Sequence, residues 1–224
     1  MTGDVPERLS FRPRRSPATG GGATGEYRLP IVDGASPAAV YVPPGATGPL
    51  RLVVVLHGAG GVARSALRLL RGRADDGRLL LVAPGSTGRT WDVIRGGYGP
   101  DVRMIDRLLD EVASAYPLSG VTLAGFSDGG TYALSLGLAN GDVFDSVIAF
   151  SPGYRAKGTT LGTPRVFVSH GTGDDLLPID RCSRRLVPRL RRTGYEVTYH
   201  EFDGGHTVPS QVVRRAATWL QRGH

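Results

Sequence analysis

The stretch that decides the fold is VTLAGFSDGG, residues 121–130. Its first part is an apolar run that predicts a buried strand over Val121–Phe126, and a helix is predicted to follow over Gly129–Leu138. Between them stands GFSDG, a G-x-S-x-G match. A sharp strand-to-helix turn leaves room only for small residues beside Ser127, and it lifts the serine hydroxyl into a cleft. The stretch therefore predicts an α/β sheet with a reactive serine at a strand end; a glycine-rich turn without chemistry is the alternative interpretation.

Strand and helix patterns alternate on both sides of this turn. Further strands are predicted at Glu26–Ile31, Ala38–Val42, Leu50–Leu56, Leu79–Ala83, Ser146–Phe150, Val166–His170 and Glu196–Phe202, with an Asp33-Gly34 turn between the first two. Further helices are predicted at Ala63–Arg73, from Pro100-Asp101 onward, at Ile179–Arg192 with a kink or break at Pro188, and at Pro209–Arg222. Continuous apolar runs suit strands that are buried on both faces. We expect a mostly parallel, doubly wound sheet with helices on both faces, in a single domain over residues 26–224.

Residues 1–25 contain proline, arginine and the Gly20-Gly21-Gly22 run without periodicity, which predicts a flexible N-terminal arm.

The chain has 27 basic and 20 acidic residues, a net charge of +7, and its arginines are scattered rather than gathered on one module. We therefore expect no nucleic-acid partner. No run approaches the roughly 20 apolar residues of a membrane span, so we do not expect membrane insertion. We expect a cytoplasmic location. The single cysteine, Cys182, is expected to be a small core residue.

A serine hydroxyl needs a neighbouring base, and histidine is the usual one. The chain has five: His57 and His170 before glycines at strand ends, His200 within a strand, His224 at the end, and His206 in the loop after the last strand. Only His206 has both the position and the chain order Ser, Asp, His that accompany this serine turn. We predict His206 as the base, with a purely structural loop histidine as the alternative.

The histidine in turn needs a buried carboxylate that fixes its tautomer and stabilises its charged form. The segment HGTGDD, residues 170–175, follows a predicted strand and supplies Asp174 and Asp175. The physical pattern barely separates these two. Asp203 is a third acid, but it stands too close in sequence to His206 for the usual arrangement.

Acyl transfer also needs backbone amides that hold the oxyanion. The segment HGAGG, residues 57–61, follows the predicted strand Leu50–Leu56 and exposes its backbone. We predict the amides of Ala59 and Asp128 as the donors. Phosphate binding is the weaker interpretation of these glycines, because neither the G-x-x-x-x-G-K-[ST] nor the G-x-G-x-x-G pattern is present.

From about residue 50 onward the chain resembles the small bacterial esterases of the phospholipase/carboxylesterase type, near the polyhydroxybutyrate-depolymerase and feruloyl-esterase-like enzymes. The segments that carry the resemblance are LHGAGG at 56–61, GPDV at 99–102, GFSDGG at 125–130, AFSPG at 149–153, HGTGDDLLP at 170–178 and GGH at 204–206. The resemblance implies an α/β-hydrolase fold and a Ser127, Asp174, His206 esterase that acts on carboxylic esters without metal or organic cofactor. It is also what favours Asp174 over Asp175.

Only a short segment separates the predicted strands Ser146–Phe150 and Val166–His170, so we expect no substantial lid and an open site for a small-molecule ester. Trp91, Tyr98 and Tyr154 are candidates for binding the substrate, with ordinary packing as the alternative for each. Arg155 and Lys157, in the short segment where a lid would be, are a hint of an acidic or phosphorylated substrate, with the general arginine richness of the chain as the alternative explanation. Two other functions remain open: thioester or peptide cleavage by the same chemistry, and a non-catalytic binding protein of the same fold.

Overall fold

The computed structural model describes residues 7–13, 22–30 and 37–222; Ile31, the Asp33-Gly34 turn and His224 lie outside them. Its centre is an eight-stranded sheet of order β1-β2-β4-β3-β5-β6-β7-β8. The strands are β1 Gly25–Leu29, β2 Ala38–Val42, β3 Leu50–Leu56, β4 Leu79–Ala83, β5 Leu118–Phe126, β6 Ser146–Phe150, β7 Arg165–Gly171 and β8 Val197–Phe202. β2 is antiparallel to both of its neighbours, and all pairs from β4 to β8 are parallel. The predicted mostly parallel sheet is confirmed.

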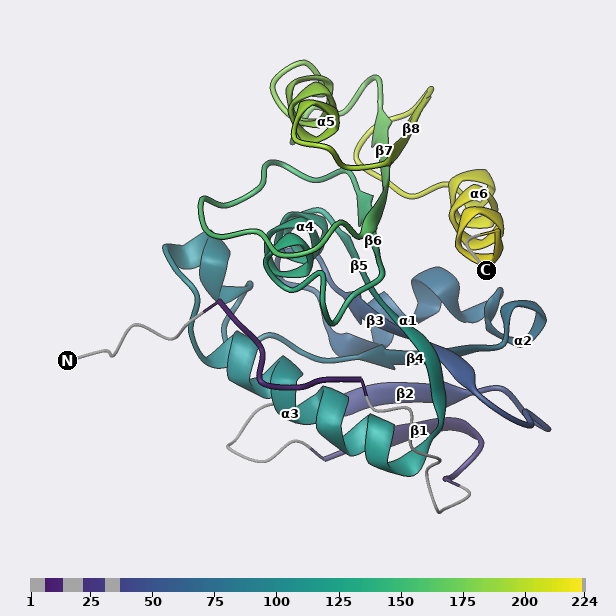
Figure 1. Ribbon diagram of the computed structural model, residues 1–224. Coiled ribbons are helices and arrows are strands. Elements are labelled where there is room, and N and C mark those ends of the chain that lie inside the picture. Colours follow the sequence, from purple (N-terminus) through teal and green to yellow (C-terminus); the bar gives the residue numbers. More distant parts are fainter. Residues whose placement is uncertain (1–6, 14–21, 31–36, 223–224) are drawn as a thin grey trace.

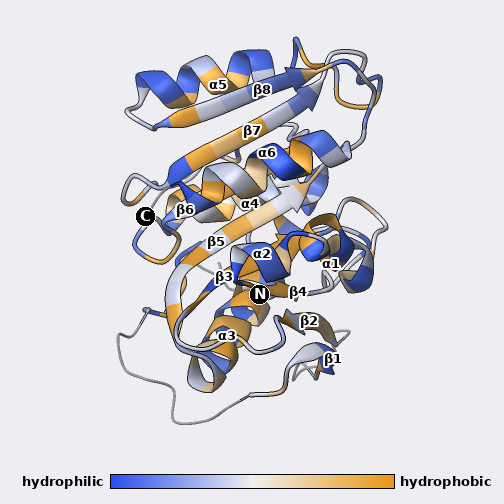
Figure 2. Cartoon of the chain, turned by 90° about the vertical axis from the view of Figure 1, so that its right-hand side faces the viewer, coloured by the Kyte–Doolittle hydropathy of each residue, from blue (hydrophilic) through white to orange (hydrophobic). Residues whose placement is uncertain are grey.

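Helices cover both faces of this sheet (Figure 1). One face carries α3 Pro100–Ala115, α4 Asp128–Ala139 and α5 Ser183–Arg192; the other carries α1 Ala63–Arg71, α2 Ala74–Gly77 and α6 Ser210–Gln221. A short 3-10 helix, η1 Asp92–Arg95, precedes α3. Alternate residues of β3 belong to two separate cores, with Leu52 and Val54 on the α3 side and Val53 and Val55 on the α1 side. Because both faces of β3 and β4 are buried, their sequences are almost entirely apolar, and Figure 2 shows orange on the inner strands of the sheet.

Several boundaries differ by one to four residues from those that the sequence predicts. The expected helix Ala63–Arg73 ends at Arg71, because Gly72 caps it and a separate turn, α2, follows. α5 begins at Ser183 instead of Ile179 and continues through Pro188 without a break. β5 begins at Leu118, ahead of the apolar run, because Leu118 pairs with Leu50 before the register shifts.

The expectation of a flexible arm over residues 1–25 is wrong for the part that the structure describes before β1. Leu9 and Phe11 are buried in the α3-side core. The Leu9 amide donates to the side-chain oxygen of Asn140 at 2.8 Å, and the Phe11 amide donates to Asp106 Oδ1 at 2.8 Å. The purple segment in Figure 1 runs across α3 for this reason. Residues 1–6 and 14–21 of the predicted arm lie outside the described residues.

The register of the parallel strands brings their carboxyl ends to one edge of the sheet. Leu56 at the end of β3 pairs with Gly125 of β5, and Phe126 pairs with Phe150 at the end of β6. The loops that follow these strands therefore meet along this edge, where α/β sheets hold their ligands. Within the described part of the chain, each helix is too short or too polar to span a bilayer.

Candidate active site

Ser127 occupies a strained turn between β5 and α4. Its φ of 59° and ψ of −120° place it in a backbone region that residues other than glycine rarely adopt. Two backbone hydrogen bonds hold this turn, from the Ser127 amide to the Phe150 carbonyl at 2.9 Å and from the Thr131 amide to the Ser127 carbonyl at 2.9 Å. A Cβ atom on Gly129 would lie 2.3 Å from the Leu56 carbonyl oxygen. The glycine of the motif is therefore required by the close approach of α4 to the end of β3.

His206 lies between the serine and an acid. Its Nε2 atom is 2.8 Å from Ser127 Oγ, and its Nδ1 atom is 2.6 Å from Asp174 Oδ2. An ionised carboxylate only accepts hydrogen bonds, so Nδ1 carries the proton and the Nε2 lone pair faces the serine hydroxyl. The Phe126 ring packs at 4.8 Å from the imidazole and limits its orientation. The structure thus brings Ser127, His206 and Asp174 together in the geometry that activates a serine nucleophile.

The side chain of Asp174 is wholly buried. Its second oxygen, Oδ1, accepts hydrogen bonds from the backbone amides of Leu176 at 3.1 Å and Leu177 at 2.8 Å. Asp175 and Asp203 are both exposed to solvent. Of the three acids that the sequence offers, Asp174 is the one that contacts His206.

The loops that carry the acid and the histidine are bonded to each other. The Thr172 amide donates to the Phe202 carbonyl at 2.9 Å, and the Gly173 amide donates to the Gly204 carbonyl at 2.9 Å. A Cβ atom on Gly171 would lie 2.3 Å from the Gly204 oxygen, so the two loops are in direct backbone contact. This contact fixes the separation of Asp174 and His206 without help from large side chains.

The predicted oxyanion loop also abuts the serine. A Cβ atom on Gly58 would lie 3.2 Å from Ser127 Cβ. Within the described residues, the amides of Ala59 and Asp128 make no hydrogen bond to another part of the chain. Asp128 is the first residue of α4, where the helix dipole adds to the attraction for negative charge. Both amides are therefore available to a developing oxyanion.

His57 has a structural role at this loop. The Ser86 amide donates to His57 Nε2 at 3.0 Å, so the proton resides on Nδ1, which donates to the Gly58 carbonyl at 2.8 Å. Burial lowers the pKa of His57 and keeps the ring neutral. The His57 carbonyl accepts from Trp91 Nε1 at 2.8 Å. The sequence places His57 beside a glycine-rich loop, but it does not reveal this role.

The three aromatic residues that the sequence offers for substrate binding lie in different surroundings. Trp91 is completely buried, and its ring stacks on Tyr132 at 5.2 Å. The prediction that Trp91 lines the substrate pocket is therefore wrong. Tyr98 is half-buried and packs beside the same Tyr132 ring, at 6.3 Å. Tyr154, by contrast, is 46% exposed, and it stays a prediction as a substrate contact.

The charges near Ser127 do not favour an acidic substrate. The carboxylate of Asp128, the next residue along the chain, accepts from Thr90 Oγ1 at 2.6 Å. The negative charge of Asp128 also contributes to the raised pKa of Tyr154, after burial. The Arg155 guanidinium donates to the carbonyls of Gly158 at 2.7 Å and Thr159 at 3.2 Å, in its own loop. The hint from Arg155 is therefore not supported by its contacts.

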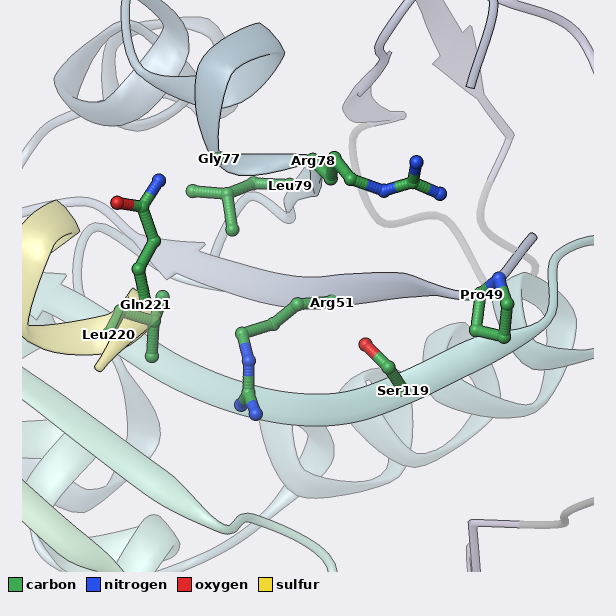
Figure 3. A pocket seen from close by; sticks show the side chains of 8 residues that line it. All are labelled: Pro49, Arg51, Gly77, Arg78, Leu79, Ser119, Leu220 and Gln221. Carbon is green, nitrogen blue, oxygen red and sulfur yellow. The ribbon is translucent and has the colours of Figure 1, made fainter. Parts of the chain in front are cut away.

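A cavity of about 270 Å³ lies at the other edge of the sheet (Figure 3). Arg51 near the start of β3, Leu79 at the start of β4 and Ser119 near the start of β5 contribute to its wall. The side chain of Arg51 is largely used within the protein, since its guanidinium contacts Asp145 Oδ1 at 2.5 Å. Because Ser127 follows the carboxyl end of β5, this cavity is separate from the candidate active site.

Comparisons with known proteins agree with this architecture. Residues 103–163 match the model of the esterase family described as "Putative esterase". No curated protein matches the chain. Together, the fold and this match over part of the chain define a protein of the α/β-hydrolase fold that is similar to esterases, in agreement with the resemblance that the sequence motifs carry.

Solved structures of α/β hydrolases superpose over most of the chain. Esterase PE8 is 23% identical, with a TM-score of 0.65, over 88% of this chain and 98% of its own. The S-formylglutathione hydrolase of Staphylococcus aureus is 17% identical, with a TM-score of 0.70, over 88% and 96%. A phospholipase/carboxylesterase from Dyadobacter fermentans is 19% identical, with a TM-score of 0.62, over 88% and 97%. These likenesses establish the α/β-hydrolase fold.

Proposed function

We propose that this protein is a carboxylesterase that cleaves small esters through an acyl-enzyme on Ser127. The observation that carries the proposal is the continuous chain of contacts from Ser127 Oγ to His206 Nε2 at 2.8 Å and from His206 Nδ1 to Asp174 Oδ2 at 2.6 Å. The similarity to the esterase family supports the choice of esters as the substrate class.

In the acylation step, Ser127 Oγ attacks the ester carbonyl carbon while His206 Nε2 takes the hydroxyl proton. The carbonyl oxygen becomes an oxyanion that the amides of Ala59 and Asp128 hold. His206 then gives its proton to the leaving alcohol as the carbon–oxygen bond breaks. Asp174 stays ionised throughout and stabilises the imidazolium.

In the deacylation step, water replaces the alcohol. His206 takes a proton from this water as its oxygen attacks the acyl carbon, and the same oxyanion site is used again. Collapse of the intermediate releases the carboxylic acid and returns the proton to Ser127. Each amide donor is worth about 3 kcal/mol of transition-state stabilisation in such sites, so both steps depend on the HGAGG loop.

A burst assay with p-nitrophenyl esters of short acids tests this proposal. We expect a burst of p-nitrophenol equal to the enzyme concentration, followed by slower turnover. Ser127→Ala should abolish the burst, and Ser151→Ala is the matched control, since Ser151 follows the neighbouring strand β6 and makes no side-chain hydrogen bond within the described chain. Equal turnover by wild type and Ser127→Ala would refute the proposal.

Thioesters are a second substrate class, because acyl transfer to serine is common to both and a structural neighbour is named as an S-formylglutathione hydrolase. A panel of matched acyl esters, acyl thioesters and peptide anilides separates the possibilities. We expect the highest kcat/KM for esters, and a preference for anilides would contradict the carboxylesterase assignment. Labelling of Ser127 by a fluorophosphonate probe distinguishes any of these enzymes from a non-catalytic protein of the same fold.

A further inference from the structure

A second histidine, His170, lies on the far side of the acid from His206. It stands in β7, and its side chain is wholly buried. Its Nδ1 atom is 2.7 Å from Ser183 Oγ, and its Nε2 atom is 2.7 Å from the Leu177 carbonyl oxygen. A carbonyl oxygen only accepts, so Nε2 must carry a proton. In the neutral ring, the Ser183 hydroxyl then donates to Nδ1.

The Nε2 atom of His170 also lies 3.2 Å from Asp174 Oδ2, the oxygen that accepts from His206. The other oxygen, Oδ1, is occupied by the amides of Leu176 and Leu177. Both oxygens of the buried carboxylate thus face N–H groups. The Leu177 residue is held twice, by its amide to Asp174 and by its carbonyl to His170.

We infer that His170 is a positioning residue that fixes the Asp174 carboxylate against His206. This inference rests on the proposed function, because it assigns the role through the Ser127, His206 and Asp174 arrangement. The acid loop offers little packing of its own, since Asp175 is exposed and Leu176 is 73% exposed. The orientation of Asp174 therefore depends on polar contacts, and His170 anchors them to β7 and, through Ser183, to the start of α5.

His170 does not compete with His206 as the base. Its Nε2 proton is committed to Leu177 and Asp174, and its Nδ1 lone pair is committed to Ser183. Other titratable groups near this pair are Cys182, whose thiol pKa is raised by burial and by Asp174, and Glu201, which pairs with His170 in the β7–β8 register. Burial lowers the pKa of His170 and favours the neutral ring that this arrangement requires.

The role predicts a defined change at His206. Without the Nε2–H group and the anchored Leu177 carbonyl, Asp174 loses its fixed orientation, and its hydrogen bond to His206 Nδ1 weakens. A weaker carboxylate contact stabilises the imidazolium form of His206 less. A purely structural role for His170 would lower the amount of folded enzyme but would leave the properties of His206 in that folded fraction unchanged.

The test uses three variants of the full chain. His170→Leu removes both ring nitrogens, His170→Gln keeps an N–H donor, and His200→Leu is the matched control because His200 lies on the adjacent strand β8 and faces the α6 side. The first readout is the pH profile of kcat/KM, corrected for active sites. We expect His170→Leu to lower kcat/KM by about 10- to 100-fold, the range typical of partners that orient a functional histidine in metal sites. The acid limb of the kcat/KM profile of His170→Leu should move to lower pH. His170→Gln should recover part of the lost kcat/KM, and His200→Leu should have the wild-type profile.

The second readout is nitrogen and proton NMR of the histidine rings, which does not depend on turnover. We expect neutral His170 protonated on Nε2 in the wild type, and an upfield shift of the His206 Nδ1 proton in His170→Gln and, more strongly, in His170→Leu. The inference is overturned if wild-type His170 is protonated on Nδ1 alone. It is also overturned if the acid limb of the kcat/KM profile and the chemical shift of the His206 Nδ1 proton are the same in the His170 variants as in the wild type. Failure of wild type to react with a fluorophosphonate would instead count against the proposed function.

Discussion

The Nδ1 nitrogen of His206 lies 2.6 Å from the Oδ2 oxygen of Asp174. This contact distinguishes Asp174 from Asp175, two adjacent acids that the sequence pattern barely separates, since Asp175 is exposed to solvent. We expect Asp174→Asn to lower kcat by roughly 10⁴-fold, as when the tautomer of a catalytic histidine is lost. Asp175→Asn is the matched control and should stay close to wild type. Steady-state kinetics on a p-nitrophenyl ester measure both, and similar losses in the two variants would contradict the assignment.

The fold and the serine could be predicted because their signals are local. A G-x-S-x-G turn needs small residues beside the serine for steric reasons that hold in any protein with this geometry, and at Gly129 the Leu56 carbonyl oxygen leaves no room for a side chain. The position of His206 follows from the sheet, since loops after parallel strands converge at one edge. These features depend on neighbours in sequence or on strand order, and both can be read from the chain.

The remaining features depend on tertiary contacts. Leu9 and Phe11 are isolated apolar residues in a polar segment. Their burial, and the acceptors Asp106 in α3 and Asn140 just after α4, show that this backbone is held in place. A tryptophan can pack in a core or line a pocket, and the sequence does not distinguish the two. The complete burial of Trp91 in the structure shows that it packs in the core. Neither the distant hydrogen-bond partners of the N-terminal segment nor the burial of Trp91 can be read from the sequence pattern.

The aromatic residues near the site give a prediction about binding and stability. Trp91→Phe removes the hydrogen bond to the His57 carbonyl, and an unsatisfied buried acceptor costs about 1–3 kcal/mol of unfolding free energy. We expect urea denaturation to show this loss while KM stays unchanged. Tyr154→Ala should do the opposite, raising KM with little effect on the urea midpoint, because the side chain is exposed. A raised KM in a stable Trp91→Phe enzyme would restore Trp91 as a substrate contact.

The N-terminal segment should contribute to stability. Leu9→Ala removes a buried side chain from the α3-side core, and such truncations cost about 2–5 kcal/mol. Leu161→Ala is the matched control, since Leu161 is 43% exposed and exposed substitutions usually change stability by less than about 0.5 kcal/mol. Urea denaturation at pH 7.5 compares the two. Equal midpoints would show that residues 7–13 are not held against the core in solution.

The carboxylate of Asp128 should select against anionic esters. It is fixed by Thr90 next to the serine, and two like charges about 4 Å apart repel by about 1 kcal/mol even at the dielectric constant of water. Asp128→Asn keeps the backbone amide and removes the charge. We expect the ratio of kcat/KM for a hemisuccinate ester to that for a neutral butyrate ester to rise roughly fivefold, in line with that energy. High salt should shrink the difference, and an unchanged ratio in the variant would exclude Asp128 as a specificity determinant.

The buried ring of His57 makes stability depend on pH. The Nε2 atom of His57 accepts a hydrogen bond from the Ser86 amide, and burial lowers the pKa of the ring. In the unfolded chain the pKa of this histidine is near 6.5. Below that pH, His57 therefore binds fewer protons in the folded protein than in the unfolded chain. The unfolding free energy should therefore be level from pH 8 to 7 and should decrease as the pH falls below about 6.5. His57→Gln offers a donor and an acceptor that do not titrate, so its urea midpoint should fall less steeply over that range. If wild type and His57→Gln show the same slope between pH 7 and 5, His57 is not responsible for the acid sensitivity.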